Sequence, residues 1–102
     1  MPITKVVLVR MKPAWFDLSE DERRNIGDEI MKIFEKYGVK SIAMLKCHWS
    51  CEEWHFISIE EHRDLESMQK YQDMVMKIKF PKYADTKLIL GTTATIDDMI
   101  KM

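Results

Sequence analysis

The chain has 102 residues, of which 46% are hydrophobic and 32% charged, and its formal net charge is −1. These values are typical of one globular domain spanning residues 1–102, and the near balance of charge gives no electrostatic reason to expect nucleic acid or an anionic membrane as partner. No apolar run approaches the roughly 18 residues of a membrane span, and two cysteines do not make a disulfide scaffold, so we expect a cytoplasmic protein.

The first third of the chain predicts a strand followed by a helix. Residues 3–11 form a dense run of apolar and β-branched residues, which predicts a central strand that ends before Pro13. Ser19 and Glu22 have the spacing of a capping box, and Gly38 is a natural helix stop. Between them an apolar stripe recurs at helical spacing: Ile26, Ile30, Ile33, Phe34 and Tyr37. We interpret Gly27, beside this stripe, as allowing close approach of the helix to a sheet.

The stretch from Ser41 to Ile59 predicts a β-hairpin with a four-residue corner at 50–53. In the expected register, three pairs of residues face each other: Trp49 and Trp54, His48 and His55, and Cys47 and Phe56. This register gives the hairpin one aromatic face and places two imidazoles near its tip.

The remaining residues complete a β-α-β-β-α-β order. Residues 59–63 lead into a helix from about Asp64 to Lys79, Lys87–Thr92 reads as the last strand, and the tail 92–102 packs as a short turn or on a neighbouring subunit. The order predicts an α+β, ferredoxin-like fold with a four-stranded antiparallel sheet and two helices on one face. Because the other face is also apolar, we expect a homodimer in which two sheets form a dimeric α/β barrel.

Candidate ligand-binding residues follow from the aromatic and charged side chains. Trp15, Phe16 and Trp54 are expected to line an apolar pocket, although the same residue types also suit a core and a dimer interface. Lys46 and Arg10 supply polar groups there, and Arg10 either holds a ligand carboxylate or pairs with a glutamate such as Glu53. His55 or His62 would act as general base, with Arg10 stabilising negative charge, so these three are the candidate catalytic residues.

A metal site is the other chemistry that the hairpin suggests. Thiolate and imidazole are the usual zinc ligands, and His48 and His55 converge in the expected register, with Cys51 as a third ligand. The spacings are not those of a zinc finger, so the alternative is a hairpin end with surface histidines.

The segment Val-Leu-Val-Arg-Met-Lys-Pro-Ala-Trp-Phe-Asp-Leu-Ser-Glu-Asp-Glu-Arg-Arg resembles the opening of darcynin-like proteins, with Pro13-Ala14-Trp15 as its sharpest motif. The resemblance implies the dimeric α/β-barrel superfamily, which includes antibiotic-biosynthesis monooxygenases, haem-degrading monooxygenases and chlorite dismutase relatives. Haem degraders of that superfamily use a strand-one asparagine, a strand-three tryptophan and a helix-two histidine. Trp54 and His62 match the last two, but the only asparagine is Asn25, on the first helix.

Two functional hypotheses follow. The first is a small-molecule enzyme, monooxygenase- or isomerase-like, that acts on an apolar or aromatic ligand; its cofactor is unknown, since the sequence requires none and leaves haem or zinc open. The second is a non-catalytic dimer that binds haem through His62, zinc, or another ligand.

Overall fold

The structure is a computed structural model that describes residues 1–102. One antiparallel sheet has helices on a single face. Its elements in chain order are β1 (Ile3–Met11), α1 (Pro13–Phe16), α2 (Glu20–Lys36), β2 (Lys40–Lys46), β3 (Phe56–His62), α3 (Leu65–Lys77), the 3₁₀ turn η1 (Phe80–Lys82), β4 (Ala84–Gly91) and α4 (Ile96–Ile100).

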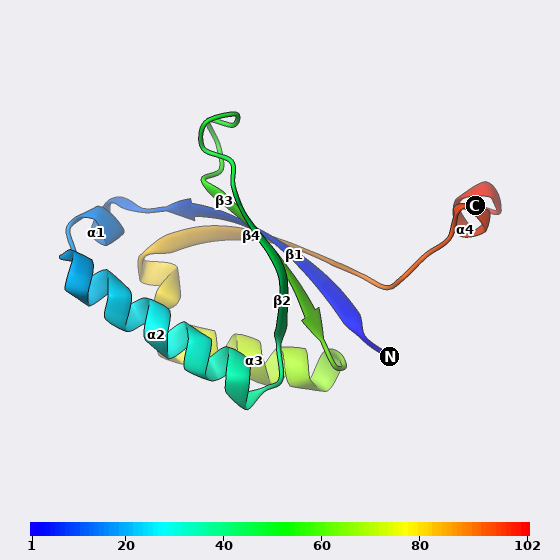
Figure 1. Cartoon of the computed structure of the whole chain (residues 1–102), viewed down its shortest axis with the longest axis horizontal. Coiled ribbons are helices and arrows are strands. Elements are labelled where there is room, and N and C mark those ends of the chain that lie inside the picture. The colour runs from blue at the N-terminus through cyan, green and yellow to red at the C-terminus, as the bar shows by residue number, and fades with distance from the viewer.

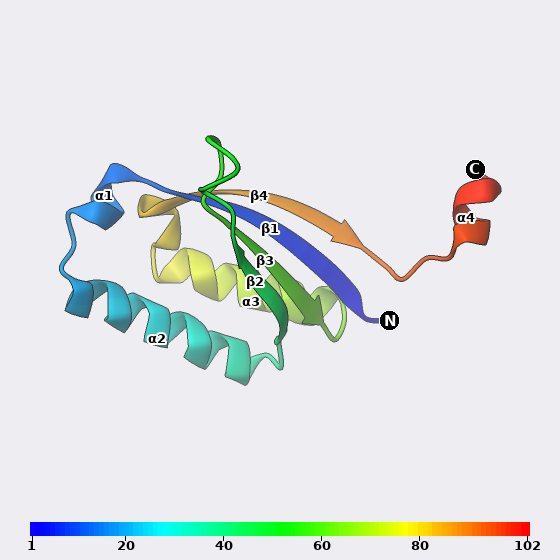
Figure 2. The same ribbon diagram turned by 45° about the horizontal axis from the view of Figure 1, so that its top comes forward.

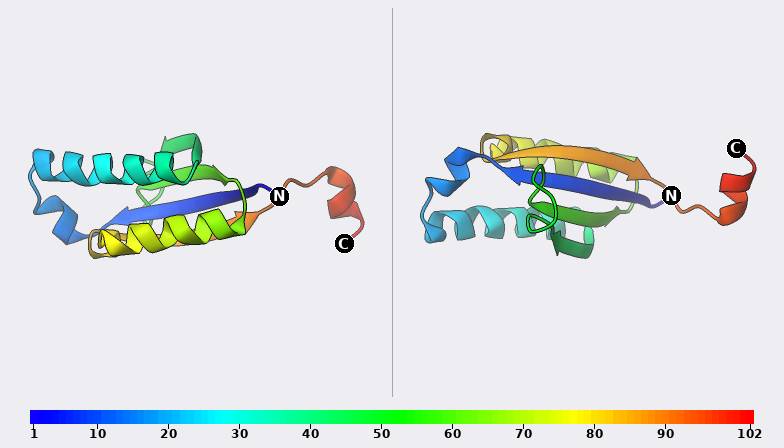
Figure 3. Two further views of the ribbon diagram at one scale, coloured as in Figure 1. Left: turned by 90° about the horizontal axis from the view of Figure 1, so that it is seen from below. Right: turned by 90° about the horizontal axis from the view of Figure 1, so that it is seen from above.

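The strand order is β2-β3-β1-β4, with every neighbouring pair antiparallel. This order confirms the ferredoxin-like α+β fold that the sequence predicts. Figures 1 and 2 show α2 and α3 side by side under the sheet. Seen from above in Figure 3, the opposite face of the sheet has no helix over it. We call the side that carries the helices the inner face and the other side the outer face.

Strand alternation assigns the residues of β1 to these two faces. Val7 and Val9 are buried on the inner face, where they pack with Ala84 of β4. Lys5 shares that face and is only 2% exposed. Val6, Leu8 and Arg10, which alternate with these residues along β1, lie on the outer face. β1 therefore supplies a buried charge, Lys5, to the inner face and apolar side chains to the outer face.

The signals for the helix ends are confirmed. Ser19 and Glu22 form both bonds of the capping box, at 3.0 and 3.1 Å, and Gly38 has the left-handed φ of +64°. Asp64 caps α3 by accepting the Ser67 N–H at 2.7 Å.

The interpretation of Gly27 is wrong. A Cβ built on Gly27 would meet no atom within 4 Å, so α2 does not approach the sheet closely at this point. The space beside Gly27 belongs instead to a cavity that is described below.

The expected hairpin register is wrong by one residue. Lys46, not Cys47, is the partner of Phe56, and the strands end there. The Ser50 and Cys51 N–H groups both donate to the Cys47 carbonyl, which turns the chain out of the strand before His48. The indole of Trp49 donates to the Lys46 carbonyl at 2.8 Å, and this side chain is 78% exposed. The two pairs predicted at the tip, Trp49 with Trp54 and His48 with His55, therefore do not form.

Strands β3 and β4 both differ in length from the prediction. β3 continues through His62, which the sequence interpretation placed near the start of the helix, because the Asp64 cap delays α3 until Leu65. β4 begins at Ala84 rather than Lys87, because it pairs with β1 from Thr4 to Met11.

The C-terminal segment after β4 stands apart from the rest of the molecule. In Figures 1–3 it leaves the end of β4 and carries α4 away from the sheet and both long helices. Thr95 and Asp98 form a capping box, so α4 is locally stabilised. We call residues 92–102 the C-terminal arm. Among all the helices, none has both the length and the apolar character needed to cross a membrane.

Candidate functional site

The inner cavity, of about 680 Å³, lies between the inner face of the sheet and the helices α2 and α3. Its volume is within the range of roughly 300–1,000 Å³ that is usual for small-molecule sites. Most lining residues are apolar. They include Val7, Val9 and Met11 from β1, Trp15 from α1, Ile30 and Phe34 from α2, Tyr71 and Val75 from α3, and Phe80 from η1. The stripe that predicts α2 as an amphipathic helix thus contributes to the wall of a cavity as well as to the core.

A polar cluster on the inner face interrupts this apolar wall. Glu60 of β3 lies opposite Lys5 of β1, and its Oε1 is 3.3 Å from Lys5 Nζ and 3.1 Å from His62 Nε2. Its Oε2 accepts a hydrogen bond from Ser58 Oγ at 3.1 Å. Alternation along β3 places Ser58 and His62 on the same face as Glu60, and the register of β1 with β3 brings Lys5 opposite it, so one carboxylate meets three donors. We call Lys5, Ser58, Glu60 and His62 the inner polar cluster.

Helix α3 covers this cluster with two further side chains. Lys5 Nζ donates to Gln72 Oε1 at 3.4 Å and lies 4.5 Å from the centre of the Tyr71 ring. The Tyr71 ring is also 5.2 Å from the imidazole of His62. Lys5, Ser58, Glu60, Tyr71 and Gln72 all line the inner cavity, whereas His62 lies behind them. A bound molecule can therefore meet the amine of Lys5, the carboxylate of Glu60 and the hydroxyl groups of Ser58 and Tyr71.

Burial controls protonation in the cluster. Desolvation lowers the pKa of Lys5, and the neighbouring Glu60 carboxylate opposes this by stabilising the ammonium form. Desolvation also lowers the pKa of His62, so its imidazole is neutral and donates its Nε2 proton to Glu60. His62 is 1% exposed, and its Nδ1 has no hydrogen-bond partner. Burial raises the pKa of Tyr71, which keeps the phenol protonated.

Of the four predicted ligand-binding residues, only Trp15 lines the inner cavity. Phe16 is 58% exposed, and Lys46 at the end of β2 is exposed as well. Trp54 lies at the other side of the sheet, where its ring is 5.3 Å from the Arg10 guanidinium.

Arg10 lies on the outer face and is not part of the cavity wall. It donates to Asp85 Oδ2 at 3.2 Å and, more weakly, to the backbone carbonyl of Glu53 at 3.4 Å. The Arg10 hydrogen bond holds the pKa of Asp85 below its usual value. The expected carboxylate partner is therefore an aspartate of β4, and Glu53 takes part through its main chain.

His55 has a structural contact that occupies one ring nitrogen. Its Nδ1 accepts the Met11 N–H at 2.9 Å, which satisfies a backbone donor where β1 ends. His48 is exposed in the loop after β2. The structure contains no group of three or more His, Cys, Asp or Glu side chains with the geometry of a metal site, so His48, Cys51 and His55 do not converge as the hairpin register predicts. Both cysteines are free.

The chain's own residues do not fit a haem held by histidine in the inner cavity. Haem iron needs an axial ligand, commonly histidine. None of the three histidines lines this cavity. His62, the residue to which the sequence hypothesis assigns haem binding, lies on β3 with its Nε2 bonded to Glu60.

Sequence reasoning missed Lys5 and Glu60. A partial signal was present, because Lys5 is a charge inside the apolar run of residues 3–11, and charges are rarely fully buried unless they are paired. The alternation that places Lys5 and Glu60 with buried neighbours is a feature of the structure. Their pairing was not visible, since it depends on the register between β1 and β3.

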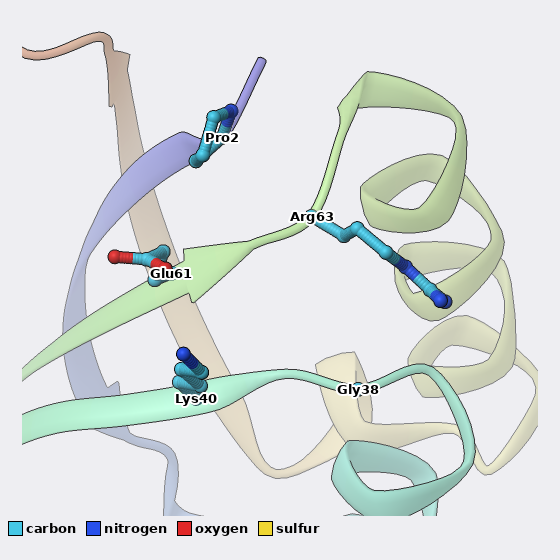
Figure 4. Close-up of a pocket in the computed structure, with 5 residues that line it drawn as sticks. All are labelled: Pro2, Gly38, Lys40, Glu61 and Arg63. Carbon is cyan, nitrogen blue, oxygen red and sulfur yellow. The ribbon is translucent and has the colours of Figure 1, made fainter.

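A second, smaller depression of about 320 Å³ is shown in Figure 4. It is lined by Pro2, Gly38, Lys40, Glu61 and Arg63. Lys40 and Glu61 are opposite each other on β2 and β3. None of the five is buried, so we consider the inner cavity the stronger candidate.

No protein-family model matches the sequence, and no curated protein matches it. Solved structures do match. A mutant chlorite dismutase from Candidatus Nitrospira defluvii has a TM-score of 0.75 at 13% identity, over 92% of this chain and 40% of that chain. The same dismutase in complex with imidazole gives a TM-score of 0.75, also at 13% identity, with 92% and 40% covered. A Rhodopseudomonas palustris protein of unknown function has a TM-score of 0.65 at 21% identity, over 92% of this chain and 83% of that chain.

These similarities concern the fold. This chain spans 40% of the length of the chlorite dismutase chain. At such identities the match is to backbone architecture, and it assigns no active-site residue. The chain therefore has the ferredoxin-like fold of chlorite dismutase-like proteins.

Proposed function

We propose that this protein is a homodimeric α/β-barrel protein that binds a small, largely apolar molecule in the inner cavity and acts on it as an enzyme. The observation that supports this most directly is the combination of a cavity of about 680 Å³ with a buried amine and carboxylate in its wall. Apolar walls with a few placed polar groups are typical of small-molecule sites, and buried ionisable groups cluster at functional sites.

The catalytic groups in this proposal are Lys5 and Glu60, because they contact the cavity. Glu60 would accept a proton from a bound molecule, and Lys5 would hold the negative charge that develops on it. His62 is a positioning residue, since its hydrogen bond at 3.1 Å fixes the carboxylate from behind. Arg10 and His55 are left out of the site because neither lines the cavity.

The cavity proposal is tested with naphthalenemethanol, an apolar aromatic probe whose fluorescence reports binding. Gly27→Phe should abolish binding, because a side chain built at Gly27 extends into the open space of the cavity. Asn25→Phe is the matched control, since Asn25 is exposed on the same helix and does not line the cavity. Equal binding by wild type and Gly27→Phe would contradict the cavity as the binding site.

Two results would favour the alternative of a non-catalytic dimer. One is haemin binding with a Soret shift that Gly27→Phe removes. The other is stoichiometric zinc in the purified protein. We expect neither, because no histidine lines the cavity and no metal-ligand group is assembled.

Dimerisation is supported by the outer face of the sheet. Strand register brings Val6 of β1, Ile59 of β3 and Ala43 of β2 into one row, with Leu8 and Ile57 in the next. At the two edges of the sheet, Leu45 is 47% exposed and Ile89 is 56% exposed. An apolar surface of this extent is uncommon on a monomer, and a second copy related by a two-fold axis would bury it.

The C-terminal arm supports the same proposal. Ile96, Met99 and Ile100 of α4 are 68%, 63% and 70% exposed. An amphipathic helix gains most of its stability by packing its apolar side, and the arm has no such contact within its own chain. We therefore place α4 against the second copy.

Sedimentation velocity tests the dimer. Wild type should sediment as a dimer, and Ile59→Glu should sediment as a folded monomer because it puts charge at the centre of the outer face. Asn25→Glu adds the same single negative charge at an exposed position of α2, on the helix side of the sheet, so it is the control and should remain dimeric. A monomeric wild type would contradict the proposal.

The two free thiols are compatible with the reducing cytoplasm in which we place the protein.

A further inference from the structure

Lys5 is the only lysine in the wall of the inner cavity, and its environment differs from that of the surface lysines. Its side chain is 2% exposed and lies in the core between β1 and α3. The other cation in the wall, Arg24, is exposed and pairs with Glu20 at 3.1 Å on α2. A molecule in the cavity therefore meets one buried primary amine.

The groups that face Lys5 allow its side chain to switch between the charged ammonium and the neutral amine. Glu60 on β3 is 3.3 Å from the amine and can take up a proton from it, and Gln72 on α3 offers a neutral acceptor at 3.4 Å. The Tyr71 ring lies over it at 4.5 Å, and the neutral His62 adds no positive charge nearby. The Glu60 carboxylate stabilises the positive charge of the Lys5 ammonium. It would stabilise an iminium at the same nitrogen in the same way, because the iminium is also positively charged.

We propose that the inner cavity takes apolar aldehydes or ketones, which Lys5 binds covalently as an imine. This inference rests on the proposed function, because it names the ligand class and the reacting atom of the same cavity. It requires an amine that reacts in its neutral form, and the desolvation that lowers the pKa of Lys5 increases the fraction of that form.

The bond changes balance without an added oxidant or reductant. The Lys5 ammonium gives one proton to Glu60, and the lone pair of the neutral amine forms a C–N bond with the carbonyl carbon as the C=O π electrons move to oxygen. A second proton passes from this nitrogen to that oxygen, which gives a neutral carbinolamine. The protonated Glu60 then returns its proton to the hydroxyl, the C–O bond breaks to release water, and the nitrogen lone pair forms the C=N bond of the iminium. The net reaction converts an ammonium and a carbonyl into an iminium and one water, and Glu60 is the counterion before and after.

The apolar wall favours this chemistry for two reasons. It selects an apolar carbonyl compound over small hydrophilic aldehydes, because burial of apolar surface supplies the binding free energy. It also limits the access of water, which would hydrolyse the imine. The surface lysines lack both features, and at pH 7 a lysine of ordinary pKa has roughly one neutral amine in 2,500.

The test uses naphthaldehyde with sodium cyanoborohydride, which reduces an imine to a stable secondary amine. Intact-mass spectrometry should show one naphthylmethyl group per chain, and peptide mapping should place it on Lys5. Naphthalenemethanol, which has no carbonyl group, should compete and reduce the labelling. Lys32→Arg is the control for an exposed lysine and should label as wild type does.

Two variants keep the result interpretable. Lys5→Met should lose the label, and Lys5→Arg should also lose it while keeping a cation beside Glu60, so that loss of folding does not explain the result. Label spread over exposed lysines, or unchanged labelling of Lys5→Arg, would overturn the inference. If naphthalenemethanol binds in the cavity but Lys5 is not labelled, the inference fails and the proposed function stands. If neither compound binds, both fail.

Discussion

Removal of the Lys5 amine should destabilise the fold far more than removal of an exposed cation. The two side chains of the Lys5–Glu60 pair are 2% and 5% exposed and 3.3 Å apart. At that distance and an effective dielectric constant of about 20, the attraction is about 5 kcal/mol before desolvation is subtracted. Lys5→Met removes the partner but leaves the Glu60 carboxylate buried, a change that typically costs about 3–5 kcal/mol.

Denaturant unfolding followed by circular dichroism measures this loss, and a double-mutant cycle isolates its cause. Glu60→Gln combined with Lys5→Met leaves no unpaired charge between these two positions, so the double variant should be more stable than the sum of the single losses predicts, by about 1–3 kcal/mol. Arg24→Met is the matched control, because its pair with Glu20 is exposed at 66% and 83% and contributes about 0.5 kcal/mol or less. Equal losses for Lys5→Met and Arg24→Met would refute the view that Lys5 is a buried ion-paired amine.

Three further predictions concern stability. Gly27→Ala should raise the free energy of unfolding by about 1 kcal/mol, because alanine is favoured over glycine inside a helix such as α2 and the added Cβ meets no atom within 4 Å. A lower melting temperature of this variant would show that the space beside Gly27 is occupied. Gly38→Ala should lower the free energy of unfolding by about 1–2 kcal/mol in the same assay, because φ is +64° there; an unchanged melting temperature would show that this conformation is not required. Stability should fall as pH drops below the ordinary histidine pKa of 6.5, because burial lowers the pKa of His62 and the unfolded chain then binds a proton that the folded chain does not. His62→Gln should reduce this slope between pH 6.5 and 5, as followed by thermal melting, and an unchanged slope would assign it to another group.

The proposed ligand site and the proposed dimer interface lie on opposite faces of the sheet. The helices cover the inner polar cluster, whereas Arg10 and Trp54 lie beside the surface that we assign to the second copy. A variant of the outer face should therefore change association without removing the cavity, and a cavity variant such as Gly27→Phe should leave association intact. The two proposals can be tested independently.

Local signals in the sequence determined the elements and their order. The capping box at Ser19, the stop at Gly38 and the dense apolar run of β1 act within a few residues, so each could be recognised without knowing the rest of the molecule. The β-α-β-β-α-β order then restricts the topology to the ferredoxin-like arrangement that the structure has.

Only the tertiary structure decided which side chains meet. A shift of one residue in pairing moves every side chain to a different partner, and the turn that starts at Cys47 shifted the hairpin in this way. The pairing of Lys5 with Glu60 joins residues 55 positions apart in the chain, through the register of β1 with β3. Strand alternation assigns a residue to one of two faces, but burial of a charge on that face depends on the helix that packs over it, which here is α3 with Tyr71 and Gln72.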